Sequence, residues 1–573
     1  MILATYATFE EMHGRKSTLD ELIERLEIYS RESVLYICSV TGIILKLWQR
    51  GGWAKENYFA LIDSAFGDIR GDYYKYALEK ADAEMVFHRR QLLFLSKLAI
   101  EHCAERGLDL LKARPGLFGT ILLMANDHFH FGTYPNPKID ERDQYDKISR
   151  IAAEFIPVNE YSGFRVQCKL VRSHLMMTRY SEQLKGHQDY INILEQYERL
   201  TGIPFLDHEA LTFGLMTRMT ELITLKGLQA DGWIAAIQPQ NFYTTAITQE
   251  TIGKFLNEVS ATPEGLLGDI QTARKSKKDF GANDFTVFRK KPVIKEGYGY
   301  LAADVMYAVE KLESGPYWRV SAIDKATGDK LRRFWGPVFE GYVNDLIKAF
   351  SPMFIADPRL IGNANEQLCD GLLVEGDALV VMEYKASMFT AEAKYSGNHV
   401  TLRDEITKKL VRDAEEDNKK GVEQLAAAIS TLFADPRKPM VPGLDVSGVK
   451  HVYPLLITLD DLGSSLLISK LLNFSFDAVF KRDAFQSVEV KPLLCTDIES
   501  IEVVIPHVVD RPLSYFLQYW LDHDPKLLAT FLAQFPEGLP ERNAFIDKHW
   551  KKLSRAISSR LFPREAAEAE GNA

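Results

Sequence analysis

Residues 367–386 read QLCDGLLVEGDALVVMEYKA, and this stretch decides how the C-terminal half of the 573-residue chain folds. Two apolar runs, at 367–374 and 378–386, flank Glu375-Gly376-Asp377. Runs of this kind, separated by a short glycine-containing turn, predict two β-strands joined in a hairpin. The register of that hairpin then fixes which polar residues at the strand ends face one another.

A type II′ turn with Gly376 and Asp377 at its centre would place Asp370 directly opposite Glu383. Directly opposite residues have Cβ atoms about 4.5–5.5 Å apart on one face of the sheet. A turn centred one residue earlier would make the two acids diagonal neighbours on that face. A three-residue loop would place them on opposite faces.

Lys385 follows Glu383 by two residues, so both side chains point to the same face, while Met382 and Tyr384 point to the other. Two carboxylates this close repel each other unless a proton or a cation lies between them. Hard oxygen ligands suit Mg²⁺ or Mn²⁺. With the gap between Asp and Glu left free, a D…E-x-K match occurs by chance on the order of once in a chain this long. An ion cluster on a solvated sheet face therefore explains the three residues, taken alone, equally well.

The segments around the hairpin predict further helices and strands. Upstream, RRFWGPVFEGYVNDLI predicts a helix at about 335–350 that carries Glu340. Downstream, we expect a long charged helix at about 403–433, with Gln424 just before its apolar face, and another strand from His451. The order helix, strands, helix, strand is that of an α/β sandwich.

The G-x-x-FE-x-Y run at 336–342, the hairpin with D and E-x-K, and the glutamine on the following helix together resemble the PD-(D/E)XK nuclease superfamily. The resemblance covers about 330–460, less than a third of the chain. It implies a restriction-endonuclease-like α/β core with the element order αβββαβ. The chain departs from the pattern at Cys369, where many members have a proline before the acid that corresponds to Asp370.

The resemblance also implies a role for each polar residue. Asp370 and Glu383 would hold one or two Mg²⁺ (or Mn²⁺) ions, and Lys385 would orient or polarise the attacking water. Gln424 would order the site or contact the phosphate. The implied metal ligands are Asp370, Glu383, the main-chain carbonyl of Tyr384, and Glu340. The implied catalytic residues are Asp370, Glu383, Lys385, Glu340 and Gln424. The implied reaction is in-line hydrolysis of a phosphodiester, which leaves a 5′-phosphate.

The N-terminal half predicts mostly helices. STLDELIERLEIYS opens with a capping signal, Thr18 followed by Glu21, and repeats apolar residues at helical spacing. RRQLLFLSKLAIEHCAERG has the same periodicity and is expected to end at Gly107. We therefore expect an α+β multidomain protein. Its expected parts are a helical recognition or regulatory region at 1–270, a basic linker and small subdomain at 271–330, the nuclease core at 331–500, and C-terminal helices with a disordered tail at 501–573.

A basic segment at 274–295 is interleaved with Phe280, Phe285 and Phe288. Such a segment either binds a phosphate backbone, with aromatic rings stacking on bases, or is a solvated linker. The nucleic-acid-binding candidates in it are Arg274, Lys275, Lys277, Lys278, Arg289, Lys290 and Lys291. The H-x-H pair of His128 and His130 has no accompanying cluster of ligands and predicts ordinary core or loop histidines.

The composition narrows the class of protein further. With 46% hydrophobic and 26% charged residues, the chain is that of an ordinary globular protein. Its five cysteines form no CxxC pair, which favours free thiols in a reducing cytoplasm. No apolar run is long enough to span a bilayer, so we expect no membrane association. The chain has no G-x-x-x-x-G-K-[ST] and no G-x-S-x-G, which argues against an ATP-driven motor and an esterase.

The resemblance implies a Mg²⁺-dependent DNA endonuclease, which we expect in the cytoplasm. By analogy with restriction-like defence nucleases, its expected role is defence against phage or other foreign DNA. The net charge of −10 argues against a surface that is positive everywhere, but not against a local basic groove. The expected partner is double-stranded DNA, and the expected state is a homo-oligomer, because cutting both strands with one site usually needs two copies. The alternatives are an inactive nuclease fold that binds nucleic acid or supports assembly, and a nuclease that acts on RNA.

Overall fold

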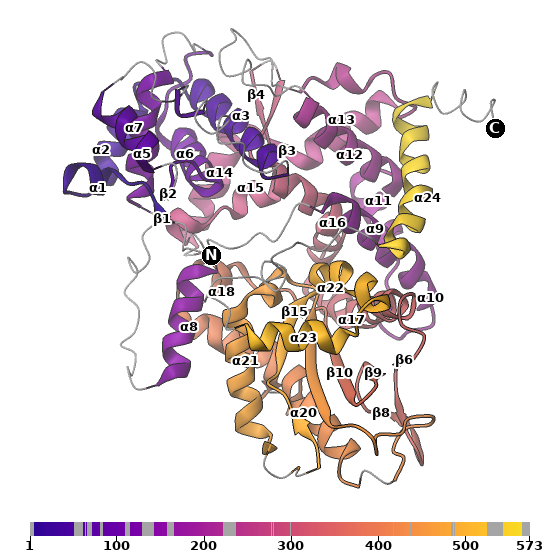
Figure 1. Ribbon diagram of the computed structural model, residues 1–573. Coiled ribbons are helices and arrows are strands. Elements are labelled where there is room, and N and C mark those ends of the chain that lie inside the picture. The colour runs from indigo at the N-terminus through magenta and orange to yellow at the C-terminus, as the bar shows by residue number, and fades with distance from the viewer. Residues whose placement is uncertain are drawn as a thin grey trace. The chain divides into compact units, whose positions relative to one another are not determined.

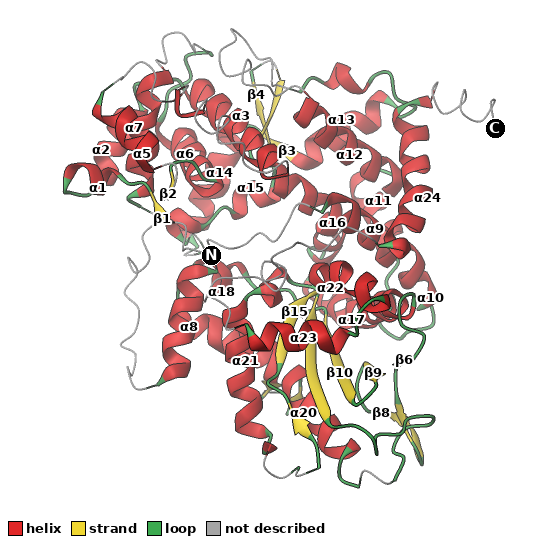
Figure 2. Ribbon diagram, in the orientation of Figure 1, coloured by secondary structure: helices red, strands yellow, loops and turns green. Residues whose placement is uncertain are grey.

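The computed structural model describes residues 5–50, 61–63, 65, 71–80, 84–108, 115–128, 143–156, 165–221, 237–276, 278, 280–297, 299–415, 417–435, 438–482, 485, 487–523 and 543–563. The chain divides into two compact units. The sheet unit comprises Tyr134–Asn192 and Ser321–Lys551, and the helical unit comprises Ile2–Thr133, Ile193–Val320 and Lys552–Ala573. The architecture is α+β, with helices predominating (Figure 1, Figure 2).

The sheet unit is built around a six-stranded mixed sheet with the order β14-β13-β10-β9-β6, in which β15 also pairs with β13. Neighbouring strands β6, β9 and β10 are antiparallel, whereas β13 runs parallel to β10, and β14 and β15 run parallel to β13. The strands are β6 (Phe354–Ala356), β9 (Gly371–Glu375), β10 (Ala378–Lys385), β13 (His451–Thr458), β14 (Glu489–Val490) and β15 (Leu494–Asp497). The predicted strand from His451 is thus confirmed, and it lies beside the predicted hairpin.

The main core of the sheet unit lies between the sheet and a layer of helices. Strand side chains such as Leu372, Leu379 and Val381 belong to one buried cluster with Leu425 and Ile429 of the helix layer. The helices that contribute to this cluster include α8 (Gln144–Phe155), α19 (His399–Ile406), α20 (Gly421–Leu432) and α21 (Leu466–Val479). Helix α8 thus joins the sheet unit, although it comes from the region predicted as a separate helical part.

The opposite face of β10 contacts α17 (Lys325–Lys348), where the rings of Phe339 and Tyr384 meet edge to face. The sequence predicts this helix from residue 335, but it begins ten residues earlier. Asp324 explains the earlier start, because its side chain caps the helix by accepting the N–H of Thr327 at 2.7 Å.

The prediction of one long charged helix at 403–433 is wrong. Helix α19 passes into a π-helical turn (Thr407–Val411), and a short ribbon, β11 (Arg412–Asp413) with β12 (Asn418–Lys419), precedes α20. Asp417 lies in the left-handed region at φ 49°, which a continuing helix does not allow. A second ribbon, β7 (Arg359–Leu360) with β8 (Asn363–Gln367), lies between β6 and β9 in the sequence.

The helical unit carries the predicted capping box, because Thr18 and Glu21 exchange side-chain hydrogen bonds with each other's backbone. The helix expected to end at Gly107 instead ends at His102, because Cys103 is already extended.

The helices of the helical unit include α1 (Phe9–His13), α2 (Leu19–Leu26), α3 (Arg31–Arg50), α5 (Asp72–Lys80), α6 (Arg89–His102), α7 (Pro115–Asn126), α11 (Ile193–Thr201), α12 (Phe205–Glu221), α13 (Gln249–Val259), α14 (Pro263–Lys275), α15 (Thr286–Lys290) and α16 (Val305–Ser321). Short strands β3 (Ser260–Ala261), β4 (Val293–Glu296) and β5 (Gly299–Ala302) form a small sheet, and β1 (Thr5–Tyr6) pairs with β2 (Glu84–Met85).

Within the described ranges, no helix taken singly has the length and apolarity that crossing a bilayer requires. One pair, α2 with the first part of α3, reaches that threshold only when the two are joined across a bend of 103°.

After the sheet, the sheet unit continues through α22 (Ile498–Val504) and α23 (Leu513–Asp522). Helix α24 (Ala544–Leu561) spans the boundary between the units in the sequence. The tail expected to be disordered lies, beyond Pro563, outside the described residues.

Candidate nuclease site

The β9–β10 hairpin has the predicted register. Glu375 pairs with Ala378, and the pairing continues to Gly371 with Met382. Gly376 has φ 64°, as the first central residue of a II′ turn requires. Asp370 and Glu383 are the next residues on the two strands beyond this last pair. The backbone N–H of Asp370 donates to Met382 O at 3.1 Å, which holds Asp370 against β10 just beyond the last paired residue of β9.

Lys385 lies between an acid and an amide. Its Nζ donates to Glu383 Oε1 and to Gln424 Oε1, each at 2.8 Å. Glu383 is 2% exposed, so this ion pair is largely shielded from water. Gln424 reaches the lysine because the first turn of α20 packs closely on the sheet. A Cβ at Gly421 would lie 2.6 Å from a methyl carbon of Leu456 and 3.2 Å from the carbonyl oxygen of Leu410, so a larger residue there would force neighbouring groups to shift.

Asp370 is held by two donors on its own edge of the site. One is the backbone N–H of Tyr384, which donates to Oδ2 at 2.6 Å. The other is Gln367, whose Nε2 donates to Asp370 Oδ1 at 3.0 Å and to Glu340 Oε1 at 3.3 Å. The amide of Gln367 thus bridges two carboxylates. Sequence reasoning missed this residue, and its only signal was its position three residues before Asp370 on an extended segment.

The acids of the site carry more negative charge than its donors offset. Burial, and then the charges of Asp357 and Glu383, raise the pKa of Glu340 to about 7. Burial, and then the charge of Glu383, raise the pKa of Asp370 well above its usual range, although Lys385 opposes this. Burial lowers the pKa of Lys385, but the charges of Glu383 and Asp370 outweigh it and raise the pKa overall. An additional positive charge would therefore stabilise this group of side chains.

Asp357 is a second residue that the sequence did not indicate. It follows β6 in the left-handed region at φ 49°, and its N–H donates to the carbonyl of Asp370 at 3.0 Å. Arg359 donates to its Oδ2 at 2.7 Å, whereas Oδ1 is buried and accepts no hydrogen bond from the described residues. A buried carboxylate oxygen without a donor adds to the negative potential near Glu340.

The donor set fits a hard divalent cation by its chemistry, because it consists of carboxylate oxygens and a carbonyl. The N–H and C=O of one strand residue point to the same side, so the Tyr384 carbonyl faces the same edge as its N–H, which contacts Asp370. In the part of the chain that the structure describes, no three His, Cys, Asp or Glu side chains are arranged to hold a metal ion. The hydrogen bonds from Lys385 and Gln367 keep the acids engaged with protein donors.

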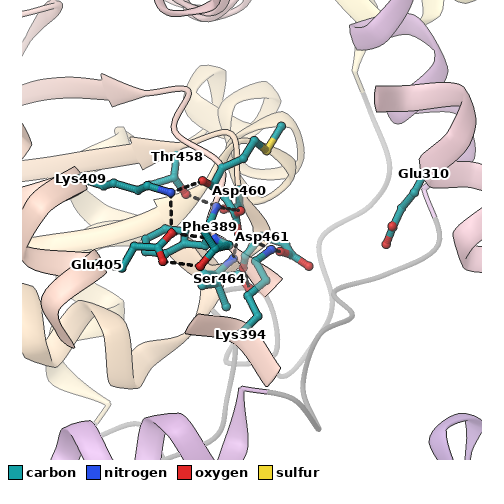
Figure 3. Close-up of polar contacts among 12 residues, drawn as sticks. Glu310, Phe389, Lys394, Glu405, Lys409, Thr458, Asp460, Asp461 and Ser464 are labelled. Atoms are coloured by element: carbon teal, nitrogen blue, oxygen red, sulfur yellow. Dashed lines mark hydrogen bonds and ion pairs between the residues drawn. The ribbon is translucent and has the colours of Figure 1, made fainter. Parts of the chain in front are cut away.

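A second charged cluster lies just beyond the C-terminal ends of β10 and β13 (Figure 3). Lys394 Nζ, on α18 (Ala391–Tyr395), contacts Asp460 Oδ1 at 2.9 Å and Asp461 Oδ1 at 3.2 Å. Asp460 also accepts the backbone N–H groups of Phe389 at 2.9 Å and Leu462 at 3.0 Å. Both oxygens of Asp460 are thus matched by fixed donors, so this cluster ties loops and a short helix to the sheet.

The basic segment lies in the helical unit and is folded into it. Phe285 and Phe288 are buried, at 3% and 0% exposure, so they cannot stack on bases as the sequence suggested. Arg274 pairs with Glu101, and Arg289 pairs with Glu310 at 2.9 Å. Lys291 donates to the backbone carbonyls of Asn257 and Glu258 at 3.0 and 2.7 Å. Lys275, Lys278 and Lys290 are exposed, and Lys277 lies outside the described residues.

Of the H-x-H pair, His130 lies outside the described residues. The neighbouring Asp127 accepts the N–H groups of Glu10 at 3.0 Å and Ser17 at 2.7 Å, so its carboxylate joins two segments of the helical unit. These contacts are those of a structural residue.

Comparison of the chain with protein-family models, with curated proteins and with solved structures gave no match, so its function is argued from the side chains described above.

Proposed function

We propose that the sheet unit is a metal-dependent nuclease of the PD-(D/E)XK type that hydrolyses phosphodiester bonds, with DNA as its substrate. The observation that carries this proposal is the convergence of Asp370, Glu383 and Lys385 at the end of one hairpin. Their environment has an excess of negative charge, and hydrolysis of a phosphodiester needs both a cation and a fixed ammonium at one point.

The order of elements also supports the proposal. Helix α17, strands β6, β9 and β10, helix α20 and strand β13 follow one another as αβββαβ, when the two short ribbons and the helices between β10 and α20 are treated as insertions. This is the order that the resemblance implies. It brings the first-helix acid, Glu340, and the second-helix amide, Gln424, to the hairpin from two sides.

Each side chain has a distinct part in the proposed reaction. A divalent cation, when bound, lowers the pKa of a coordinated water and offsets charge on the phosphate. Asp370, Glu383 and the Tyr384 carbonyl would hold it, with Glu340 as a further ligand. Lys385 places a fixed positive charge beside the negative charge that develops on the phosphate. Gln424 keeps the lysine in this position through its 2.8 Å hydrogen bond.

We further propose that the activity is directed against phage or other foreign DNA, and that the helical unit restrains or directs it. This part rests on analogy with defence nucleases that have a comparable arrangement. An inactive fold that only binds nucleic acid is the alternative from another class. The retained acids favour the enzyme, because a buried excess of negative charge costs stability and brings no benefit without a cation.

The test is cleavage of plasmid DNA, with an RNA transcript in parallel, in Mg²⁺, Mn²⁺ or EDTA. We expect the wild type to cut only with a metal ion, Asp370→Asn and Glu383→Gln each to abolish cutting, and Lys385→Met to slow it by about 10²–10³-fold. Asp377→Asn is the matched control, since it removes a half-exposed carboxylate from the turn of the same hairpin. Wild-type cutting by all three site variants would refute the proposal.

A further inference from the structure

Two short ribbons flank the candidate site, one on each side. The β7–β8 ribbon ends at Gln367, which donates to Asp370 and Glu340. The β11–β12 ribbon ends at Lys419 and leads directly into α20, whose Gln424 contacts Lys385. A strand of substrate that crosses the site would therefore pass from one ribbon to the other.

The two ribbons differ in how their cations are paired. On the β7–β8 side, Arg359 is paired with Asp357 at 2.7 Å, and Asn363 donates to Glu366 at 2.9 Å. This ribbon adjoins Asp370 and Glu340, so its side of the site is acidic. It offers no unpaired cation among its described side chains, and a phosphate backbone would be repelled there.

On the β11–β12 side, the neighbouring cations are matched by acids. Arg412 pairs with Asp417 and with Glu423, the latter at 2.9 Å, and Lys408 pairs with Glu415 at 2.5 Å. Lys419 and Lys420 are different. Among the described residues, neither ammonium group has a hydrogen-bond or ion-pair partner, and Lys419 is exposed while Lys420 is partly exposed.

These two lysines are held at a fixed place relative to the site. The carbonyl of Lys420 accepts the N–H of Gln424 at 2.9 Å, so the two residues are about one helical turn apart, about 6 Å along the axis. The N–H of Lys420 donates to Val411 O at 3.1 Å. The close packing at Gly421 presses the same turn onto β13. The backbone that carries the lysines is thus anchored beside Lys385, although their side chains reach into solvent.

We propose that Lys419 and Lys420 bind the phosphodiester backbone of duplex DNA on the Lys385 side of the scissile bond. The inference rests on the proposed nuclease function and adds the direction in which the substrate leaves the site. Each ammonium group that neutralises a phosphate releases condensed counterions, so its contribution is visible in the salt dependence of binding. The lysines act on affinity and not on the chemical step.

The test measures binding of a labelled DNA duplex in EDTA by fluorescence anisotropy, over a series of salt concentrations, for the full-length protein. The double variant Lys419→Gln/Lys420→Gln is expected to reduce the slope of log K against log salt by about 1.8, since each phosphate contact contributes about 0.9. In Mg²⁺, its KM for DNA should rise while kcat at saturating DNA stays at the wild-type value.

Two controls make the result specific. Lys408→Gln removes a nearby lysine that is already paired with Glu415, and it should keep the wild-type slope. Lys275→Gln/Lys278→Gln removes the same charge from the basic segment of the helical unit and should also keep it. A reduced slope for that pair, with none for Lys419→Gln/Lys420→Gln, would overturn the inference and place the DNA on the basic segment.

The two proposals can fail separately. If Mg²⁺-dependent cutting persists and Lys419→Gln/Lys420→Gln keeps the wild-type slope and KM, this inference is wrong and the nuclease assignment stands. If the wild type neither binds nor cuts nucleic acid, the nuclease assignment is wrong and the inference fails with it.

Discussion

The sheet unit contains two charged clusters near the C-terminal ends of β10 and β13, and their acids are neutralised in different ways. Asp460 is matched by Lys394 and by two backbone N–H groups. Glu340, Asp370 and Glu383 share one ammonium group, one bridging amide and one backbone N–H. In the first cluster both oxygens of Asp460 have donors, although burial, and then the charge of Asp461, still raise its pKa. The second remains short of positive charge, which is what a site for a cation and a phosphate requires.

The largest expected effect on stability is at the cluster of Lys394, Asp460 and Asp461. Lys394→Met leaves the buried carboxylate of Asp460 without its cation, and breaking a buried pair in this way costs about 3–5 kcal/mol. The measurement is the free energy of unfolding in urea. Lys450→Met is the control, because its ion pair with Asp377 is 3.5 Å long and exposed, and its loss should cost less than about 1 kcal/mol. If both variants lost the same free energy of unfolding, the Lys394 cluster would be no more important for stability than an exposed ion pair.

Lys385→Met should differ from Lys394→Met in its effect on catalysis. We expect kcat for DNA cleavage to fall by about 10²–10³-fold, the usual cost of one positioned donor at a developing charge. Stability should also fall by a comparable amount, because Glu383 is 2% exposed and Lys385 is the cation that contacts it among the described residues. A folded Lys394 variant, tested in parallel, should cleave at the wild-type rate. If Lys385→Met cleaved normally, Lys385 would be a structural residue like Lys394.

Binding of a metal ion should stabilise only the cluster that lacks positive charge. At a free Mn²⁺ concentration 100 times Kd, the wild type should gain about 2.7 kcal/mol relative to EDTA. Asp370→Asn should lose this gain and, in EDTA, should be more stable than the wild type by about 0.5–2 kcal/mol, because it relieves repulsion among the acids. The thermal midpoint with and without metal provides the measurement. The same midpoint for wild type in both solutions would contradict the prediction.

A further expected effect is on the pH dependence of stability in EDTA. The pKa of Glu340 is raised to about 7, so folding favours its protonated form. Its contribution to stability is present below the unfolded pKa near 4.5 and is lost as the pH rises through about 7. Glu340→Gln should therefore be more stable than the wild type at pH 8, by about 1–3 kcal/mol, and the difference should shrink toward pH 4.5. An unchanged difference across this range would show that Glu340 titrates normally.

The hairpin and its acids could be predicted from the sequence because they depend on local rules. A two-residue turn fixes the register, and the alternation of a strand then fixes the face of Glu383 and Lys385. Gln367 and Asp357 could not be predicted in this way. Gln367 reaches the site from an adjacent ribbon, and Asp357 depends on a left-handed backbone that an aspartate rarely adopts.

Three other features depend on contacts that no local pattern records. The charged stretch before α20 has helix-forming residues, yet it folds as a ribbon in which Arg412 pairs with Asp417 and Glu423. Phe285 and Phe288 have the spacing of residues that could contact nucleic acid, but the core of the helical unit buries them. Helix α8 lies far before the sheet in the sequence, and Ala152 and Ile156 nevertheless complete the core beneath it.

Gly421 has no side chain that could react, yet it affects the distance between two proposed groups. One is Lys385, proposed to act on the phosphate, and the other is the pair Lys419 and Lys420, proposed to bind the DNA backbone. A methyl group there would meet Leu456 at 2.6 Å and the carbonyl of Leu410 at 3.2 Å, and would push the start of α20 outward. Gln424 and Lys420 would move together, so Gly421→Ala should lower both kcat for cleavage and the affinity for DNA. A mutational survey restricted to reactive side chains would overlook the position on which both depend.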